Sequence, residues 1–202
     1  MSLILITLSR ASNLVIIFVI FLGACTLAPK NSVEYDLNFA PQMPIKLKVG
    51  QVIVENRSKT NQKNDITMRL PIPLNSAFEV WIGKRLRAVG ASKNIKIRVI
   101  IHQSSVLETK LKIDESIRGA FTDQQAYRYL FVIKASFLVI DNVGRTLAES
   151  NVKASESVTT SEGLTLLERD TALHNTLKKL LSNFDSQMRK SFATYFLKWL
   201  QN

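Results

Sequence analysis

The chain has 202 residues, and its 27 Lys and Arg against 16 Asp and Glu give a formal net charge of +11. A single cysteine excludes a framework of disulfides, and the length suits one domain with a well-packed core. The charge favours anionic partners through long-range attraction, although a basic surface that is only solvated would give the same composition.

The first 24 residues have the features of a secretory signal. Arg10 precedes an apolar run over residues 14–22, which is shorter than the roughly 20 residues that a membrane-spanning helix needs. The alternative is an uncleaved membrane helix that includes residues 1–7, with Arg10 in mid-span.

The apolar run ends in Leu22-Gly23-Ala24-Cys25, which contains the only cysteine. This tetrapeptide resembles the lipobox of bacterial lipoproteins. The resemblance implies cleavage between Ala24 and Cys25 and lipid attachment at Cys25. An exported, lipid-anchored chain with this charge meets anionic lipid, lipopolysaccharide or acidic proteins, and we expect no nucleic-acid partner.

Residues 25–44 contain three prolines and little periodicity, which predicts a lipidated tether. Thr26 follows the cysteine, and in lipoprotein families where aspartate at this position retains the protein in the inner membrane, this favours the outer membrane. We expect a lipid-anchored protein of the bacterial cell envelope that faces the periplasm, with residues 45–202 as one periplasmic domain.

Four segments have the period-two alternation of strands. They are residues 45–54, 94–108, 126–140 and 145–159. The last two are joined by Asp141-Asn142-Val143-Gly144, which predicts a hairpin turn with Gly144 at a positive φ. A long polar connection over residues 57–73 precedes the first helix. A second one over residues 109–125 precedes the third strand.

Residues 76–89 have helical spacing and open on a capping box formed by Ser76 and Glu79. The pattern predicts a helix that ends at Gly90 and exposes its basic residues, Arg85 among them.

A second, longer helix is predicted to open on a capping box formed by Thr165 and Glu168, and one apolar stripe continues to Trp199. Its aromatic end, residues 192–199, either packs into the core or overhangs to meet a partner or a membrane.

This element order, β-α-β-β-β-α, predicts an α+β fold. We expect a two-layer sandwich in which an antiparallel sheet of about four strands carries both helices on one face.

No catalytic or metal-binding constellation is evident. His102 and His174 have no matching cysteine or acidic cluster, and no Gly-x-Ser-x-Gly, Walker or dinucleotide motif occurs. Asp114 and Glu115 are adjacent residues between basic neighbours, which is typical of a solvated charge cluster. The sequence therefore predicts a protein that is not an enzyme and holds no metal or cofactor.

Lipobox, tether and element order resemble the small outer-membrane lipoproteins of proteobacteria, including the lipopolysaccharide-assembly and YajG-like families. Residues 120–129 are similar to the Phe…Gln-x-Ala-x-Tyr entry into the central strand of the assembly lipoprotein. The mature chain also resembles a group of alphaproteobacterial lipoproteins that share Gly-Ala-Phe-Thr-x-x-Gln-Ala-x-Arg-Tyr, here residues 119–129. The resemblance implies a part in envelope or lipopolysaccharide assembly.

The sheet face away from the helices is the candidate site for an anionic ligand. Its basic residues are Lys96, Arg98, Arg128 and Lys134. They alternate with apolar residues, and a face that is both basic and apolar suits a phosphorylated lipid, since an exposed antiparallel face is normally polar. The alternative is that the loop over residues 57–73 half covers this face.

A second hypothesis is a protein-interaction role as an accessory subunit. In it, the loop that carries Arg118, Phe121 and Gln125 docks with the helix end on an outer-membrane barrel or transporter. A third is simple tethering within the envelope.

Overall fold

The computed structural model describes residues 43–59, 63–91, 93–111 and 125–201. The chain divides into two compact units, Met1–Glu34 and Tyr35–Asn202, and all described residues belong to the second. The predicted signal peptide, Ala24 and Cys25 lie outside the described residues. Among the helices that are described, none is both long and apolar enough to cross a membrane.

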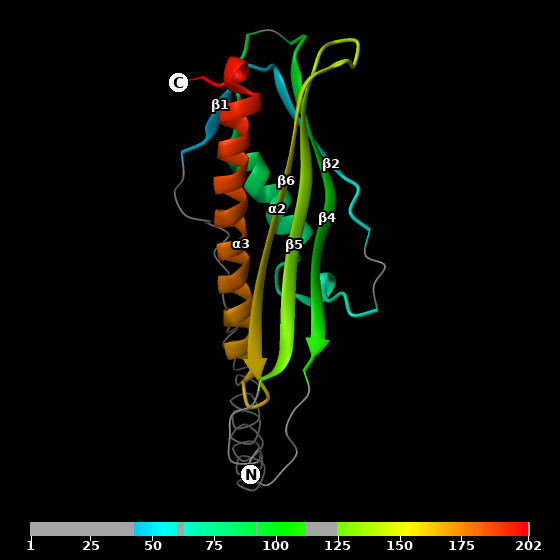
Figure 1. Ribbon diagram of the computed structural model, residues 1–202, viewed down its shortest axis with the longest axis vertical. Coiled ribbons are helices and arrows are strands. Elements are labelled where there is room, and N and C mark those ends of the chain that lie inside the picture. Colours follow the sequence, from blue (N-terminus) through cyan, green and yellow to red (C-terminus); the bar gives the residue numbers. More distant parts are fainter. Residues whose placement is uncertain (1–42, 60–62, 92, 112–124, 202) are drawn as a thin grey trace, which may run out of the picture. The chain divides into compact units, whose positions relative to one another are not determined.

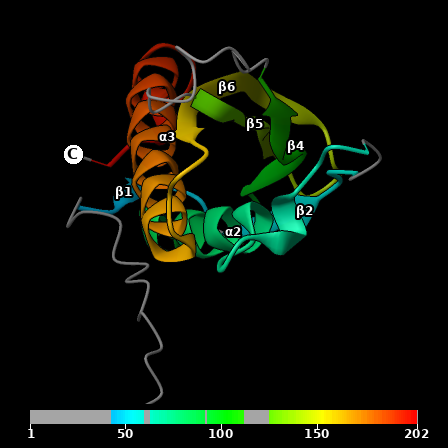
Figure 2. The ribbon, with the colours of Figure 1, turned by 90° about the horizontal axis from the view of Figure 1, so that it is seen from below.

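The principal sheet has four strands in the order β2-β4-β5-β6. Their bounds are Gln51–Asn56 for β2, Lys96–Lys110 for β4, Gln125–Ile140 for β5 and Thr146–Ser161 for β6. Two helices, α2 (Leu74–Arg85) and α3 (Leu166–Tyr195), pack on one side of this sheet (Figures 1 and 2). The α+β class, the four strands and the two helices on one face are as predicted.

The sheet is mixed, whereas the sequence predicted an antiparallel one. β4, β5 and β6 are antiparallel neighbours, but β2 runs parallel to β4. The reason is that α2 connects these two strands, and a helical connection returns the chain to the end at which it started. The hairpin between β5 and β6 forms as predicted, with Gly144 at φ 85°.

The predicted strand over residues 45–54 is in fact two strands in different sheets. β1 (Ile45–Leu47) pairs in parallel with β3 (Leu86–Ala88), and only β2 joins the principal sheet. Gly90 makes this arrangement possible, because its N–H donates to the Val49 carbonyl and a Cβ on it would come within 2.7 Å of Lys48 backbone. Gly90 therefore permits a close backbone approach and does not end a helix.

Helix α2 differs from its prediction at both ends. Its N-cap is Pro73 and no side chain caps it, so the predicted capping box of Ser76 and Glu79 is wrong. Glu79 instead accepts a hydrogen bond from Asn56 Nδ2 of β2 at 2.8 Å. The helix ends at Arg85 because the chain continues into β3, whose pairing with β1 replaces the next helical turn.

Aromatic rings join the two helices in the core. Phe78 of α2 and Phe184 of α3 meet edge to face with their centroids 4.9 Å apart, and Trp81 meets Phe184 at 5.8 Å. Phe137 of β5 lies 6.2 Å from the same Phe184 ring. Phe184 is thus the point at which both helices and the sheet interlock.

Arg85 was predicted to be exposed, and this is wrong. Its side chain is buried, and its guanidinium donates two hydrogen bonds to the Asp185 carboxylate of α3. A buried arginine keeps its charge and therefore needs a carboxylate at the same depth. Arg189, whose side chain is 55% exposed, also pairs with this carboxylate, with its Nε 2.9 Å from Asp185 Oδ2.

The predicted capping box at the start of α3 is confirmed. The Glu168 N–H donates to Thr165 Oγ1 at 3.3 Å, and the Thr165 N–H donates to the Glu168 carboxylate at 2.9 Å. Hydrogen bonds from the Thr165 side chain and backbone lower the pKa of Glu168.

The aromatic end of α3 packs mainly into the core, which was one of the two predicted alternatives. Phe192 and Phe196 are fully buried, while Tyr195 is exposed. The chain then turns through η4 (Leu197–Trp199) and pairs with β1, since the Lys48 N–H donates to the Trp199 carbonyl at 2.7 Å.

Candidate functional site

We call the face of the principal sheet away from the helices the outer face; Figure 1 views it with α2 behind the strands. Strand alternation directs buried residues such as Val99 and Phe137 toward the helices. The four predicted basic residues occupy the alternate positions and all lie on the outer face, which no helix of the described residues covers. They are Lys96, Arg98, Arg128 and Lys134.

These four residues share a face but do not surround one ligand. Lys96 stands opposite Ile140, whereas Arg128 lies near the other end of β5, opposite Thr109. Arg128 and Ile140 are 12 positions apart along β5, or about 40 Å. Arg98 also has a counterion, because its Nε lies 3.0 Å from the Glu55 carboxylate of β2.

Of the four predicted residues, Lys134 is the one that has a basic residue directly opposite it on a neighbouring strand. The register places it directly opposite Lys153 of β6 and Gln103 of β4. Both lysines are exposed, and neither forms an ion pair among the residues that the structure describes. Like charges directly opposite on neighbouring strands are destabilising, so this pair does not serve the fold.

A chain of hydrogen bonds crosses the outer face next to this pair. A β-bulge in β4 at His102 places its Nε2 2.6 Å from Ser136 Oγ of β5, and Ser136 Oγ also bonds Asn151 Oδ1 of β6. The single hydroxyl proton of Ser136 goes to Asn151, so the Nε2 of His102 carries a proton and donates it. His102 therefore cannot act as a base toward Ser136 in this arrangement.

Arg57 and Lys59 add basic character beside the bulge. Together with Asp65 they line an open polar depression whose other side is His102, Gln103 and Ser105. We call Arg57, Lys59, His102, Lys134 and Lys153 the central basic cluster. Sequence reasoning found only Lys134. Lys153 comes opposite it through strand register, His102 joins through the bulge, and Arg57 and Lys59 lie on the segment after β2 that borders β4. Arg57 is also paired with Glu55 of β2.

The described part of the predicted 57–73 loop runs along the edge of β4. The Arg57 N–H donates to the Ile101 carbonyl at 2.9 Å, and the Glu108 N–H donates to the Asn64 carbonyl at 2.9 Å. These bonds pair the otherwise free edge of β4 beyond the end of β2, and they leave the lysines of β5 and β6 accessible.

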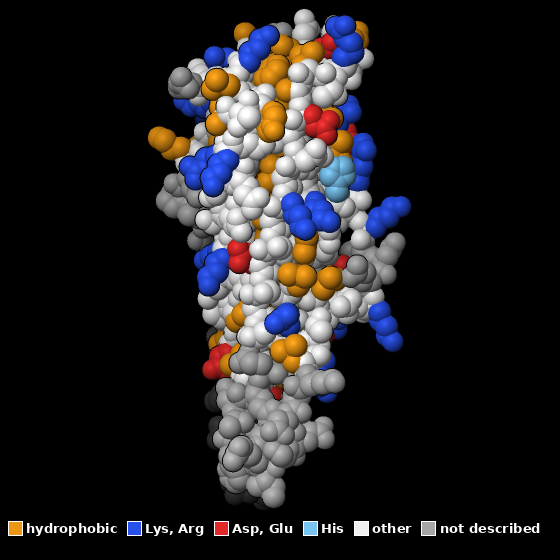
Figure 3. Space-filling view, in the orientation of Figure 1, with side chains coloured by type: hydrophobic (Ala, Val, Ile, Leu, Met, Phe, Trp, Pro, Cys, Tyr) orange, Lys and Arg blue, Asp and Glu red, His pale blue; other side chains and the backbone are white. Residues whose placement is uncertain are grey.

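The apolar residues of the outer face are less exposed than the sequence predicted. Ile100 and Val132 are each only 7% exposed, while Leu130 is 37% exposed. Figure 3, in the orientation of Figure 1, shows blue basic side chains near the middle of this face with scattered orange apolar ones above and below them. The surface is therefore basic and polar, with small apolar patches.

Arg118 and Phe121, the centre of the predicted partner loop, lie outside the described residues. Gln125 is the first residue of β5 and stands opposite Ser161. The partner-loop hypothesis therefore stays a prediction.

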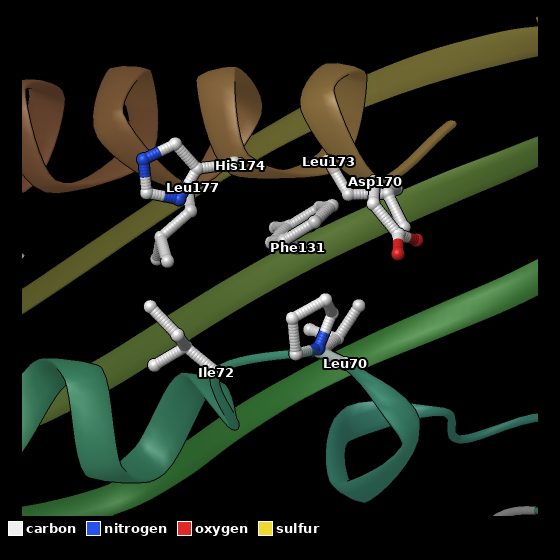
Figure 4. A pocket seen from close by; sticks show the side chains of 8 residues that line it. Leu70, Ile72, Phe131, Asp170, Leu173, His174 and Leu177 are labelled. Atoms are coloured by element: carbon white, nitrogen blue, oxygen red, sulfur yellow. The ribbon is translucent and has the colours of Figure 1, made fainter. Parts of the chain in front are cut away.

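A small apolar recess opens on the helix side of the sheet (Figure 4). It lies between α3 and the segment before α2, with the buried ring of Phe131 between them. Its lining is Leu70, Pro71, Ile72, Phe131, Asp170, Leu173, His174 and Leu177. In Figure 4 His174 and Asp170 lie at its two ends.

A buried hydroxyl lies on the helix-facing side of the sheet. Burial raises the pKa of Tyr129, and the nearby Glu108 carboxylate, which accepts its hydrogen bond, raises it further. Arg169 and a hydrogen bond from Thr160 act in the opposite direction. The neutral hydroxyl thus links β4, β5 and β6 through hydrogen bonds.

Among the described residues, no group of three or more His, Cys, Asp and Glu is placed to hold a metal ion.

No family model matches the chain, and no curated protein matches it. Solved structures similar to it include rare lipoprotein B from Shewanella oneidensis, at 12% identity and TM-score 0.36 over 71% of this chain and 95% of that one. A minor lipoprotein from Acinetobacter baumannii has 12% identity and TM-score 0.37 over 75% and 96% of the two chains. Uncharacterized lipoprotein B from Nitrosomonas europaea has 13% identity and TM-score 0.37 over 77% and 91%. All three are bacterial lipoproteins by name, and likeness at this level supports no statement about function.

Proposed function

We propose that the chain is a non-catalytic, lipid-anchored envelope protein that binds an anionic envelope component through the outer face of its sheet. The observation that carries this proposal is the pair of Lys134 and Lys153. Two exposed ammonium groups on neighbouring strands repel each other, and an anion with two or more negative charges relieves that repulsion. Phosphorylated lipids, lipopolysaccharide among them, are the anions of this kind that an exported protein meets.

The lipobox-like tetrapeptide supports the location. Diacylation at Cys25 followed by acylation of the new amino terminus gives more than one chain, and two or more chains hold a protein stably on a membrane, whereas one does not. Thr26 supports the outer membrane with the domain in the periplasm. A ligand held in the same membrane or crossing the periplasm is then within reach of the outer face.

The geometry around His102 supports a binding role over a catalytic one. In the contact between His102 and Ser136 the imidazole is the donor, whereas a serine nucleophile needs it as acceptor. The exposed ammonium groups of Lys134 and Lys153 beside this hydrogen-bond chain can bind the oxygens of an anion.

Retention of the detergent-solubilised, full-length protein on immobilised lipopolysaccharide and on cardiolipin tests the proposal. We expect the variant Arg98→Glu, Arg128→Glu, Lys134→Glu and the smaller variant Lys134→Glu, Lys153→Glu to lose at least tenfold in affinity. The matched control is Lys178→Glu, Lys179→Glu on the exposed side of α3, which makes the same charge change as the smaller variant. Equal retention of the outer-face and control variants would contradict the proposal.

The second candidate function is that of an accessory subunit on an outer-membrane barrel or transporter. The observation that favours it is that the predicted partner loop leads into the buried part of β5, where Ala126 and Tyr129 are each 1% exposed. A photocrosslinker at Phe121 in intact membranes should then capture one protein. Lipid adducts alone would count against it.

A further inference from the structure

The two ends of the described domain differ sharply in charge. One end gathers β1, β3, the start of β4, the β5–β6 turn and the C-terminal residues. The Gly50 N–H donates to the Ile95 carbonyl at 2.8 Å, the Lys48 N–H donates to the Trp199 carbonyl, and Lys96 stands opposite Ile140. These parts lie together at the top of Figure 1. We call residues 43–50, 86–96, 140–146 and 197–201 the basic end.

Among the described residues, the basic end has seven basic side chains and one acidic one. The basic residues are Lys46, Lys48, Arg87, Lys93, Lys96, Arg145 and Lys198. The acidic one, Asp141, is paired with Arg145 at 2.8 Å. The opposite end, residues 63–69, 106–111, 125–130 and 156–174, has five basic and six acidic side chains. The excess positive charge is therefore concentrated and not spread evenly.

Exposed apolar side chains lie among these charges. Met43 and Val89 belong to the basic end, as does Leu197, which is 68% exposed. The exposed Tyr195 lies two residues before Leu197. Lys46 stands beside Arg87 in the β1–β3 register, and the Lys198 ammonium lies 5.8 Å from the centroid of the Trp199 ring. Long basic side chains with apolar stems, mixed with exposed apolar and aromatic groups, are typical of surfaces that lie in the headgroup layer of a bilayer.

The described part of the chain also begins at this end, where Met43 and Pro44 precede β1. Only residues 26–42 separate this point from Cys25, and 17 residues reach at most about 60 Å. With lipid on Cys25, contact between the basic end and the membrane becomes an intramolecular event, so weak individual attractions suffice.

We propose that the basic end lies against the surface of an anionic bilayer as a second membrane contact beside the lipid. The charges come from several segments and are mixed with single apolar residues, an arrangement that fits a fluid array of headgroups better than one shaped partner. This membrane contact depends on the proposed lipid attachment at Cys25, which brings the domain to the membrane. It does not depend on ligand binding by the outer face.

Fluorescence quenching in vesicles tests this proposal on the full-length, lipidated protein. Cys25 is the only natural cysteine and its sulfur carries the lipid, so Leu197→Cys provides the single free thiol for a polarity-sensitive fluorophore. The matched control is Leu166→Cys at the opposite end, where Leu166 is 65% exposed. In vesicles of phosphatidylglycerol and phosphatidylethanolamine, we expect quenching by doxyl-labelled lipid to be at least threefold greater at position 197 than at 166.

The difference should disappear in phosphatidylcholine vesicles, at 1 M salt, and in the variant Lys46→Glu, Arg87→Glu, Lys198→Glu. Lys134→Glu, Lys153→Glu should leave it unchanged, which separates this contact from the outer-face site. Equal quenching at the two positions, or no dependence on lipid charge, would overturn the proposal. Labelling of the unaltered chain would contradict lipid at Cys25 and therefore the second contact as well.

Discussion

The two faces of the principal sheet are made by alternate residues of the same strands, yet they are built differently. The helix-facing side carries large side chains that are fully buried, such as Ile101, Phe131 and Phe137. The outer face carries the pair of Lys134 and Lys153, which weakens the sheet. A strand can thus hold the fold with one set of positions and keep the other set free for a ligand. Mutations on the helix-facing side should mainly lower stability, whereas mutations on the outer face should mainly weaken ligand binding.

The largest effect should come from the helix-facing side, at the buried ion pair. Asp185→Ala leaves the Arg85 guanidinium buried without its carboxylate, and we expect the free energy of unfolding to fall by about 3–5 kcal/mol in urea denaturation. Arg189→Ala is the control, because its exposed ion pair with Asp185 should contribute less than about 1 kcal/mol. A loss below about 1 kcal/mol for Asp185→Ala would mean that Arg85 finds water or another acceptor.

Neighbouring isoleucines of β4 compare the two faces directly. Ile101 is 0% exposed on the helix-facing side and Ile100 is 7% exposed on the outer face. We expect Ile101→Ala to cost an amount near the upper end of about 2–5 kcal/mol, because it leaves a closed cavity. Ile100→Ala should fall near the lower end, because water fills the space that it opens. Equal losses in urea denaturation would show that the outer face is packed as tightly as the core.

The buried hydroxyl of Tyr129 should make stability depend on alkaline pH. Burial raises the folded-state pKa of Tyr129 above the unfolded value of about 10. Its contribution is therefore fully present below pH of about 10 and is lost as the pH rises from there toward the folded-state pKa. Tyr129→Phe should unfold about 1–3 kcal/mol more easily at pH 8, since Glu108 loses its donor. The difference between the two proteins should narrow above pH 10, and a constant difference would contradict the assignment.

Long periodic segments were predictable from the sequence. β5 begins one residue before its prediction and ends where predicted, and α3 opens on the predicted capping box. The short segment 86–88 was not predictable, because it continues the spacing of the helix before it and becomes a strand only by pairing with β1. The Arg85–Asp185 contact joins residues 100 positions apart, a distance that no local pattern reports.

The candidate site was predictable as a face but not as a cluster. Alternation placed all four basic residues on one side, yet their neighbours depend on register. Counting back from the turn, where Ile140 stands opposite Thr146, would place Val152 opposite Lys134. A register shift next to Val139 brings Lys153 there instead. One irregular residue thus decides whether the two ammonium groups meet, and the sequence gives no local signal for it.

The smallest expected effect tests the proposed division between the faces most directly. Lys153→Glu replaces a repulsive cross-strand pair with an attractive one, so we expect the free energy of unfolding to rise by about 0.2–1 kcal/mol at low salt, with the gain reduced at 0.5 M salt. The same variant should bind immobilised lipopolysaccharide more weakly. Lys178→Glu on α3 makes the same charge change and should alter stability by no more than about 0.5 kcal/mol, with no loss of retention. A variant that gains stability and loses binding would show that Lys153 is retained for a ligand at the expense of the sheet.

If Lys153→Glu instead lowers stability, the two ammonium groups do not repel each other in the folded protein. The argument that they share an anion would then be wrong.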